Sequence, residues 1–184
     1  MRVIGGRSRG RRLAAKLPRT VRPTSDRVRE SIFDILGSQG GVEGLRTVDL
    51  FCGSGALGLE ALSRGAASVT FVDQDPIALD AVRTNLAAVG LDGEAVTLVR
   101  AALPGWLRTA AAGTFDLALC DPPYDFGDWA ALLGALQADV AVLESSASAS
   151  TPVPEQLPEP WVVTKARRYG GTLVTVAHRN GVGS

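Results

Sequence analysis

Short hydrophobic runs alternate with amphipathic segments along most of the chain. The runs predict five strands, at 47–51, 68–73, 95–100, 115–121 and 140–144. Between them, hydrophobic residues at helical spacing predict helices near 56–64, 76–89, 104–112 and 128–138. Strands that are apolar throughout and alternate with helices are typical of a doubly wound α/β fold, in which helices cover both faces of a parallel sheet.

A further helix is predicted before the first strand. One of the polar residues at 24–26 caps it, its apolar residues recur at helical spacing, and Gly37 ends it. Three glycines then form a linker into the main body. We therefore divide the chain into an N-terminal extension, residues 1–44, and a main domain, residues 45–184.

The last third of the chain follows a different pattern. A Ser- and Pro-rich stretch at 145–160 predicts a surface loop. Two apolar runs after it, at 161–167 and 172–179, predict an antiparallel hairpin that closes the sheet.

A glycine motif directly follows the first predicted strand. The sequence Gly53-Ser54-Gly55-Ala56-Leu57-Gly58 matches G-x-G-x-x-G and opens a predicted helix. Asp73 stands 20 residues after Gly53, at the end of the next strand, where an acid can bind a ribose diol. The motif fits a nicotinamide dinucleotide or S-adenosylmethionine, and the alternative is a tight turn without a ligand.

Asp49 favours S-adenosylmethionine. It stands four residues before Gly53, where a carboxylate suits a methionine ammonium and repels a pyrophosphate. Phe51, between them, is expected under the cofactor or in the core.

A second motif, Asp121-Pro122-Pro123-Tyr124, ends the fourth strand, because two prolines cannot continue a central strand. The first and fourth strands of a doubly wound sheet are neighbours at the point where the strand order reverses, so both motifs face one cleft. Asp121 and the Pro122 carbonyl can each accept an N–H of an exocyclic base amine, and Tyr124 can stack on the base. The alternative is a proline-rich turn with an aspartate cap.

Charge is distributed unevenly along this neutral chain. Residues 1–29 hold ten basic residues and one acidic residue, Asp26, so they carry +9 and the remainder carries −9. A basic segment on an acidic body suggests a nucleic-acid partner, with a solvated tail as the alternative. The arginines expected to contact phosphates are Arg7, Arg9, Arg11, Arg12, Arg22, Arg27 and Arg29. On the predicted hairpin, Lys165, Arg167 and Arg168 suit either a phosphate or a solvated end.

The amino-acid composition argues against several kinds of site and several classes of protein. One histidine and two cysteines argue against a zinc site and against histidine-centred acid–base catalysis, so no metal is expected. We expect Cys52 and Cys120 to be small buried residues and His178 to lie at the surface. No apolar run is long enough to span a bilayer, and two cysteines are too few for a disulfide framework. These features predict a cytoplasmic protein with no membrane partner.

Taken together, these motifs resemble the RsmD-type methyltransferases, which methylate a guanine N2 in small-subunit (16S) ribosomal RNA. The similarity also covers the basic stretch at 7–13 and the segment Arg22-Pro23-Thr24-Ser25-Asp26-Arg27-Val28-Arg29-Glu30, which is specific to this family. The resemblance implies a Rossmann-like methyltransferase sheet of seven strands with an antiparallel last strand. It also implies an N-terminal extension that holds RNA and S-adenosylmethionine as the cofactor. The expected partner is ribosomal RNA or a small-subunit particle, and the expected state is a monomer.

Three other functions fit parts of the sequence. A DNA adenine-N6 or cytosine-N4 amino-methyltransferase would share both motifs, but 184 residues leave no room for a target-reading domain. A nicotinamide dehydrogenase is disfavoured by Asp49. The third is a non-catalytic RNA-binding module with a relic methyltransferase fold.

Overall fold

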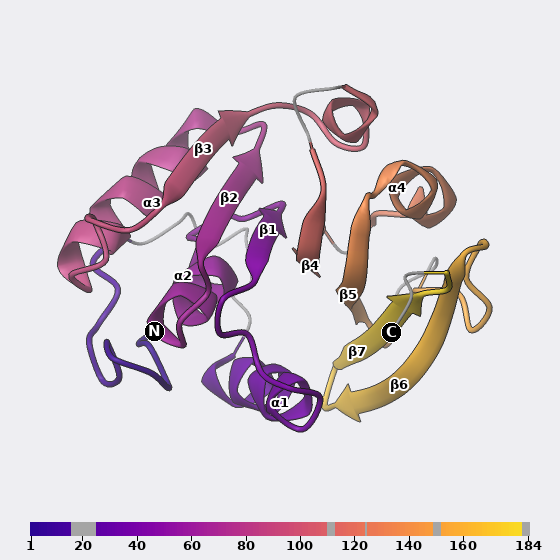
Figure 1. The fold of residues 1–184 in the computed structure, drawn as a ribbon, viewed down its shortest axis with the longest axis horizontal. Helices are drawn as coiled ribbons and strands as arrows, with labels where there is room; N and C mark the ends of the chain where they lie inside the picture. The colour runs from indigo at the N-terminus through magenta and orange to yellow at the C-terminus, as the bar shows by residue number, and fades with distance from the viewer. Residues whose placement is uncertain (16–24, 110–112, 124, 149–151, 182–184) are drawn as a thin grey trace.

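A seven-stranded sheet forms the centre of the molecule (Figure 1). The computed structural model describes residues 1–15, 25–109, 113–123, 125–148 and 152–181. The strands are β1 (Arg46–Leu50), β2 (Ser68–Asp73), β3 (Val96–Arg100), β4 (Phe115–Cys120), β5 (Ala138–Ser146), β6 (Trp161–Tyr169) and β7 (Thr172–Arg179). Their order across the sheet is β3-β2-β1-β4-β5-β7-β6. Strands β1 to β5 are parallel, whereas β7 is antiparallel to both β5 and β6, so the predicted sheet is confirmed.

The helices follow the predicted order with one exception. They are α1 (Asp26–Gly37), α2 (Ala56–Ser63), α3 (Pro76–Ala88), the short 3₁₀ helix η1 (Gly105–Arg108) and α4 (Trp129–Ala135). Ser25 is the cap of α1, because its side chain accepts a hydrogen bond from the Val28 N–H. The helix predicted at 104–112 is wrong where the chain is described. It is reduced to η1 because Gly105 is a poor helix former and Thr109 adopts an extended backbone.

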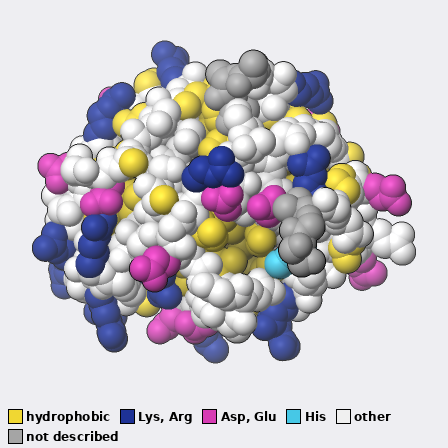
Figure 2. Space-filling view, in the orientation of Figure 1, with side chains coloured by type: hydrophobic (Ala, Val, Ile, Leu, Met, Phe, Trp, Pro, Cys, Tyr) yellow, Lys and Arg dark blue, Asp and Glu magenta, His cyan; other side chains and the backbone are white. Residues whose placement is uncertain are grey.

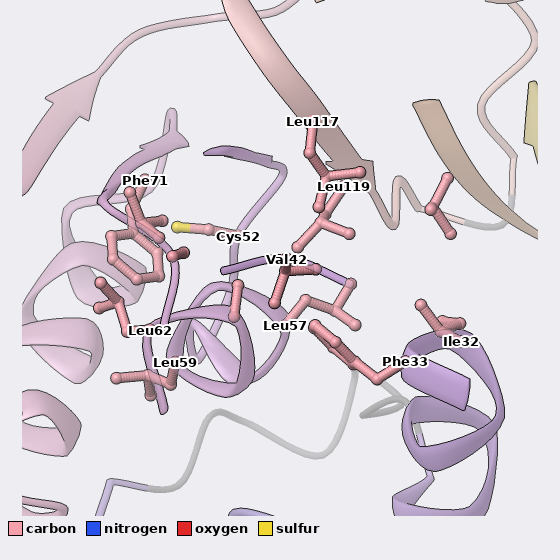
Figure 3. Packing of buried hydrophobic residues seen from close by; sticks show 14 of the residues in the cluster. Ile32, Phe33, Val42, Cys52, Leu57, Leu59, Leu62, Phe71, Leu117 and Leu119 are labelled. Carbon is pink, nitrogen blue, oxygen red and sulfur yellow. The ribbon is translucent and has the colours of Figure 1, made fainter. Parts of the chain in front are cut away.

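Helices α1, α2 and α3 cover one face of the sheet. Strand residues alternate between the two faces, and those on this face include Phe71 of β2 and Leu119 of β4. Figure 3 shows α1 and α2 packed together over them, with Phe33 of α1 beside Leu57 of α2. The N-terminal extension therefore shares its hydrophobic core with the main domain.

Helix α4 and η1 cover the opposite face, where Trp129 and Trp161 are buried. Part of the predicted surface loop belongs to this layer. Ser145 and Ser146 extend β5 and pair with β7, and Val153 is buried in the same cluster. The loop prediction was wrong at these positions because serine and proline content does not report which side chains are covered.

Glu60 of α2 ties the N-terminal extension to the main domain. Its side chain is 1% exposed, and its carboxylate accepts hydrogen bonds from the backbone N–H groups of Ile4 and Gly5, at 2.8 and 2.7 Å. The Nε of Arg64 donates to it at 2.8 Å, and the Nε of Arg29 in α1 lies 3.6 Å away. One buried carboxylate thus contacts three separate parts of the chain.

The first residues dock on the C-terminal ends of α2 and α3. The Arg7 N–H donates to the Ser63 carbonyl at 2.9 Å, and Arg11 Nη1 donates to the Val89 carbonyl at 2.7 Å. A Cβ at Gly6, whose φ is +72°, would lie 1.9 Å from the Ser63 carbonyl oxygen. Both helices run back from the carboxyl ends of the strands, so this docking site lies at the amino end of the parallel strands.

We expect Glu60→Ala to lower the free energy of unfolding by about 3–5 kcal/mol, because it removes the buried carboxylate beside Arg29 and the acceptor of the Ile4 and Gly5 N–H groups. Urea unfolding measures this change. Asp80→Ala is the control, since it removes the exposed pair with Arg83 and should cost under about 1 kcal/mol. Equal costs for the two variants would contradict the role given to Glu60.

Candidate functional site

The two sequence motifs meet at the carboxyl ends of β1, β2 and β4. Leu50, the last residue of β1, pairs with Val72 on one side and with Cys120 on the other. The glycine loop therefore starts between Asp73 and Asp121, at the place where the strand order reverses. The two motifs therefore share one edge of the sheet, as predicted, and the cleft between them stays a prediction.

Three carboxylates project from this edge toward the same face of the sheet. Asp49 is level with Phe71 and Leu119, whose side chains belong to the core under α2 and α3. Asp73 and Asp121 each follow one of these two residues by two positions, so strand alternation places them on the same face. Burial raises the pKa of the Asp49 carboxyl well above its ordinary value, and the charges of Asp121 and Asp73 raise it further. The edge therefore gathers three acidic side chains, of which the buried Asp49 is harder to ionise than an exposed aspartate.

Asp49 and Asp73 each accept a hydrogen bond from a backbone N–H of the glycine motif. The Gly58 N–H donates to Asp49 at 2.9 Å, and the Gly53 N–H donates to Asp73 at 3.0 Å. Asp49 is 1% exposed, so it lies beneath the loop and not at its open surface. Asp73 is half-buried and also accepts from the Asp75 N–H, which leaves lone pairs on its carboxylate for a ligand.

The glycines are required by backbone geometry and by packing. Gly53 and Gly55 have φ of 52° and 76°, in the left-handed region. A Cβ at Gly58 would lie 2.3 Å from the ring of Phe71. The N-cap of helix α2 is Gly55, which has no side chain, and the Asp49 carboxylate accepts the Gly58 N–H in the first turn instead.

Phe51, which follows β1, does not continue the alternation of side chains between the two faces of the sheet. Its φ of 58° is unusual for a bulky residue, and its ring turns toward Phe126 with a centroid distance of 5.2 Å. Phe126 in turn lies edge-on to Trp129 at 5.0 Å. These three rings connect the glycine loop to the segment that follows Asp121-Pro122-Pro123.

The proline motif turns the chain out of β4. Asp121 is half-buried, Pro122 is buried and Pro123 is exposed. The Pro123 carbonyl accepts a hydrogen bond from the Phe126 N–H at 2.9 Å, which closes a tight turn. Tyr124, predicted to stack on a base, lies outside the described residues.

Asn85 of α3 is a site residue that the sequence analysis missed. Its side chain is 0% exposed. Its Nδ2 donates to the Ser54 carbonyl at 2.9 Å, and its Oδ1 accepts from the Ala15 N–H at 2.8 Å. One side chain therefore joins the glycine loop to the N-terminal extension. Its position three residues after Val82, on the buried side of α3, was the available indication.

The remaining polar candidates lie apart from the site or are buried. His178 pairs with Val140 near the start of β5, at the opposite end of the sheet. Figure 2 shows this one histidine, in cyan, beside a patch of hydrophobic side chains. Cys52 and Cys120 are buried as predicted, and burial raises the pKa of each thiol. Neither thiol is therefore an activated nucleophile.

The predicted phosphate-binding arginines are dispersed. Arg7 pairs with Glu94 at 2.5 Å, and Arg11 is anchored on Val89. Arg9, Arg12 and Arg27 are exposed, and Arg22 lies outside the described residues. On the face shown in Figure 2, basic side chains lie mostly around the outline and form no single patch.

Arg29 was wrongly predicted to contact phosphate. Its side chain is 1% exposed, and its guanidinium contacts Glu60, Asp26 and the Arg2 carbonyl. It lies on the buried face of α1 with Ile32, Phe33 and Leu36, at helical spacing.

Neither a metal nor a membrane site is found in the part of the chain that the structure describes. No three His, Cys, Asp or Glu side chains there gather in a way that could hold a metal ion. No helix there combines the length and the apolar character that crossing a membrane requires.

Comparison with known proteins gives a family match over almost the whole chain. The family model described as Conserved hypothetical protein 95 matches residues 1–178. YlbH of Bacillus subtilis is 37% identical over 188 residues, which cover 98% of this chain and 100% of YlbH. Ribosomal RNA small subunit methyltransferase D of Haemophilus influenzae is 34% identical over 127 residues, which cover 68% of this chain and 65% of that enzyme. The solved structure of yhhF from Escherichia coli has a TM-score of 0.79 at 30% identity and covers 97% of each chain.

We expect Asn85→Ala to loosen the glycine loop, because it leaves the Ser54 carbonyl and the Ala15 N–H without their partner. The free energy of unfolding should fall by about 2–4 kcal/mol. Hydrogen exchange should become faster at the loop amides.

Thr84→Ala is the matched control, because Thr84 is the exposed neighbour of Asn85 on the same helix. It should change neither quantity appreciably. Unchanged loop exchange in Asn85→Ala would contradict the bridging role.

Proposed function

Because this chain belongs to the Conserved hypothetical protein 95 family, the RsmD family, we propose that it methylates small-subunit (16S) ribosomal RNA. The proposed target is the exocyclic N2 amine of a guanine, and the proposed methyl donor is S-adenosylmethionine. The observation that carries the proposal is the placement of Asp121-Pro122-Pro123 beside the glycine loop, on neighbouring strand ends. The relatives named ribosomal RNA small subunit methyltransferase D support the reaction class and the choice of the small subunit.

The residues at the strand edge fit S-adenosylmethionine. Asp73 retains acceptor capacity for a ribose diol at the end of β2. Gly55 at the start of α2 has no side chain, so the methionine carboxylate can approach the backbone there. Phe51 forms an apolar wall on the side of β4. When ionised, Asp49 adds negative charge beneath the loop, which favours the positively charged ammonium and sulfonium groups.

When bound, S-adenosylmethionine supplies an electrophilic methyl group on its sulfonium. The work of the protein is then to position the amine. The Asp121 carboxylate accepts one N–H of the amine and the Pro122 carbonyl accepts the other, which holds the nitrogen lone pair toward the methyl group. No strong base is required, because an alkylated ammonium is acidic and releases its proton readily. This agrees with a site in which the single histidine lies at the far end of the sheet.

The proposed reaction is tested on small-subunit particles and on free 16S RNA from cells that lack the corresponding methyltransferase. Incubation with labelled S-adenosylmethionine, followed by nucleoside analysis, should give N2-methylguanosine. Methylated adenine or cytosine from a DNA substrate would favour the DNA amino-methyltransferase instead. Cofactor binding without transfer to any nucleic acid would favour the relic binding module.

Asp121→Ala should reduce the rate of methyl transfer by at least about a hundredfold, because the amine loses one of its two acceptors. Affinity for S-adenosylmethionine should change little, which calorimetry measures. Asp116→Ala is the control, since Asp116 lies at the other end of the same strand and pairs with Arg46. If Asp121→Ala transferred the methyl group at close to the rate of the unmodified protein, Asp121 would have no part in the mechanism.

Affinity for S-adenosylmethionine should increase with pH across the range in which Asp49 ionises, and this range lies above that of an ordinary aspartate. Burial raises the pKa of the Asp49 carboxyl, and only the ionised form attracts a cation. Asp49→Asn keeps an acceptor for the Gly58 N–H and should remove most of this dependence. An identical pH profile in the variant would exclude Asp49 as the cause.

A further inference from the structure

The basic residues at the N-terminus are docked far from the proposed reaction. Arg7 and Arg11 contact the ends of α2 and α3, at the amino end of the parallel strands. Asp121 and the glycine loop lie at the carboxyl end. These two arginines therefore do not lie beside the base that would receive the methyl group.

The carboxyl end itself is acidic. Asp73 and Asp121 lie at its centre, and Asp75, Asp125 and Asp128 are exposed in the segments around them. Such a surface repels RNA phosphates, so cations beside it are needed to hold an RNA there.

Strand β6 brings three cations to this end. It runs parallel to β5, so its last residues lie at the carboxyl end of the sheet. Arg167 and Arg168 are exposed and Lys165 is half-buried. Figure 1 shows β6 at the edge of the sheet, where one side of the strand has no neighbouring strand.

The register places Arg167 level with Asp121. Leu119, Val142, Val176 and Lys165 form one row across β4, β5, β7 and β6. Two residues further toward the carboxyl end, the next row on this face contains Glu144, Val174 and Arg167, and Asp121 is level with it when the β4–β5 register is extended by one residue. Three strand spacings separate these two residues, a distance of about 14 Å. A few nucleotides of RNA can span this distance.

These three side chains are available to a ligand. None of them forms an ion pair with an acid in the described part of the chain. Arg168 Nε donates to the Gly170 carbonyl at 3.0 Å, which orients the guanidinium near the turn between β6 and β7 and leaves its other N–H groups for a phosphate.

We propose that Lys165, Arg167 and Arg168 form an RNA-binding edge that holds the phosphates beside the target base. This inference rests on the proposed function and names a binding surface for its substrate. Guanidinium groups suit phosphate because they can donate two hydrogen bonds to one phosphate group. Contacts of this kind position the RNA without reading its sequence.

The test compares two triple variants with the same change in charge. The edge variant is Lys165→Gln, Arg167→Gln and Arg168→Gln. The control variant is Arg46→Gln, Arg83→Gln and Arg179→Gln, which removes three cations elsewhere, two of them at the amino end of the sheet. Binding to a 16S RNA fragment is measured by fluorescence anisotropy at several salt concentrations, and affinity for S-adenosylmethionine is measured alongside.

The edge variant should bind RNA about tenfold or more weakly, and the slope of log K against log salt should become shallower by about 2–3. KM for RNA should rise while the transfer rate at saturating RNA and the cofactor affinity stay close to those of the unmodified protein. The control variant should have a smaller effect on RNA binding. Equal losses in the two variants, or RNA affinity unchanged in the edge variant, would overturn the proposal.

Failure of the proposed function has a different signature. The unmodified protein would then fail to methylate 16S RNA, whatever the edge variant does to RNA binding. Failure of the inference alone leaves methylation intact in the unmodified protein and RNA affinity the same in the edge variant.

Discussion

The buried carboxylate of Glu60 organises the part of the molecule on which the site depends. It lies in α2, the helix that begins at the glycine loop, and it contacts the first residues of the chain and Arg29 of α1. The desolvation of this carboxylate is compensated by two backbone N–H groups and two guanidinium groups. Because α2 cannot shift without breaking these contacts, they fix the position of the glycine loop at the end of β1. Asn85 adds a second connection, from the loop itself to the N-terminal extension.

Charge is separated along the strand direction in a way that suits two different ligands. The carboxyl end of the sheet gathers Asp49, Asp73 and Asp121, which suit the proposed cationic cofactor, and Asp121 is proposed to accept an N–H of the amine. Acidic side chains disfavour RNA phosphates, so the proposed RNA substrate would have to be held from beside the site. The basic edge of β6 lies level with Asp121 and fits that requirement, whereas Arg7 and Arg11 are engaged at the other end.

Hydrophobic patterning predicted most of the fold, and motif spacing predicted which residues meet. Apolar runs located all seven strands, and the order of the first and fourth strands placed the glycine loop beside Asp121. The sequence indicated less well where charge is buried. Arg29 was assigned to a solvent-facing role although it shares a helical face with Ile32 and Leu36. The burial of Asn85 and Glu60 depends on contacts with the N-terminal extension, and the positive φ of Phe51 depends on packing against Phe126, so neither follows from local composition.

A crystal structure with S-adenosylhomocysteine would show directly where the cofactor lies relative to the residues proposed to hold the amine. The ribose hydroxyls should lie within hydrogen-bond distance of the Asp73 carboxylate, and the sulfur should face Asp121 across the end of β1. A ligand bound away from the glycine loop, or one whose sulfur faces away from Asp121, would contradict this placement.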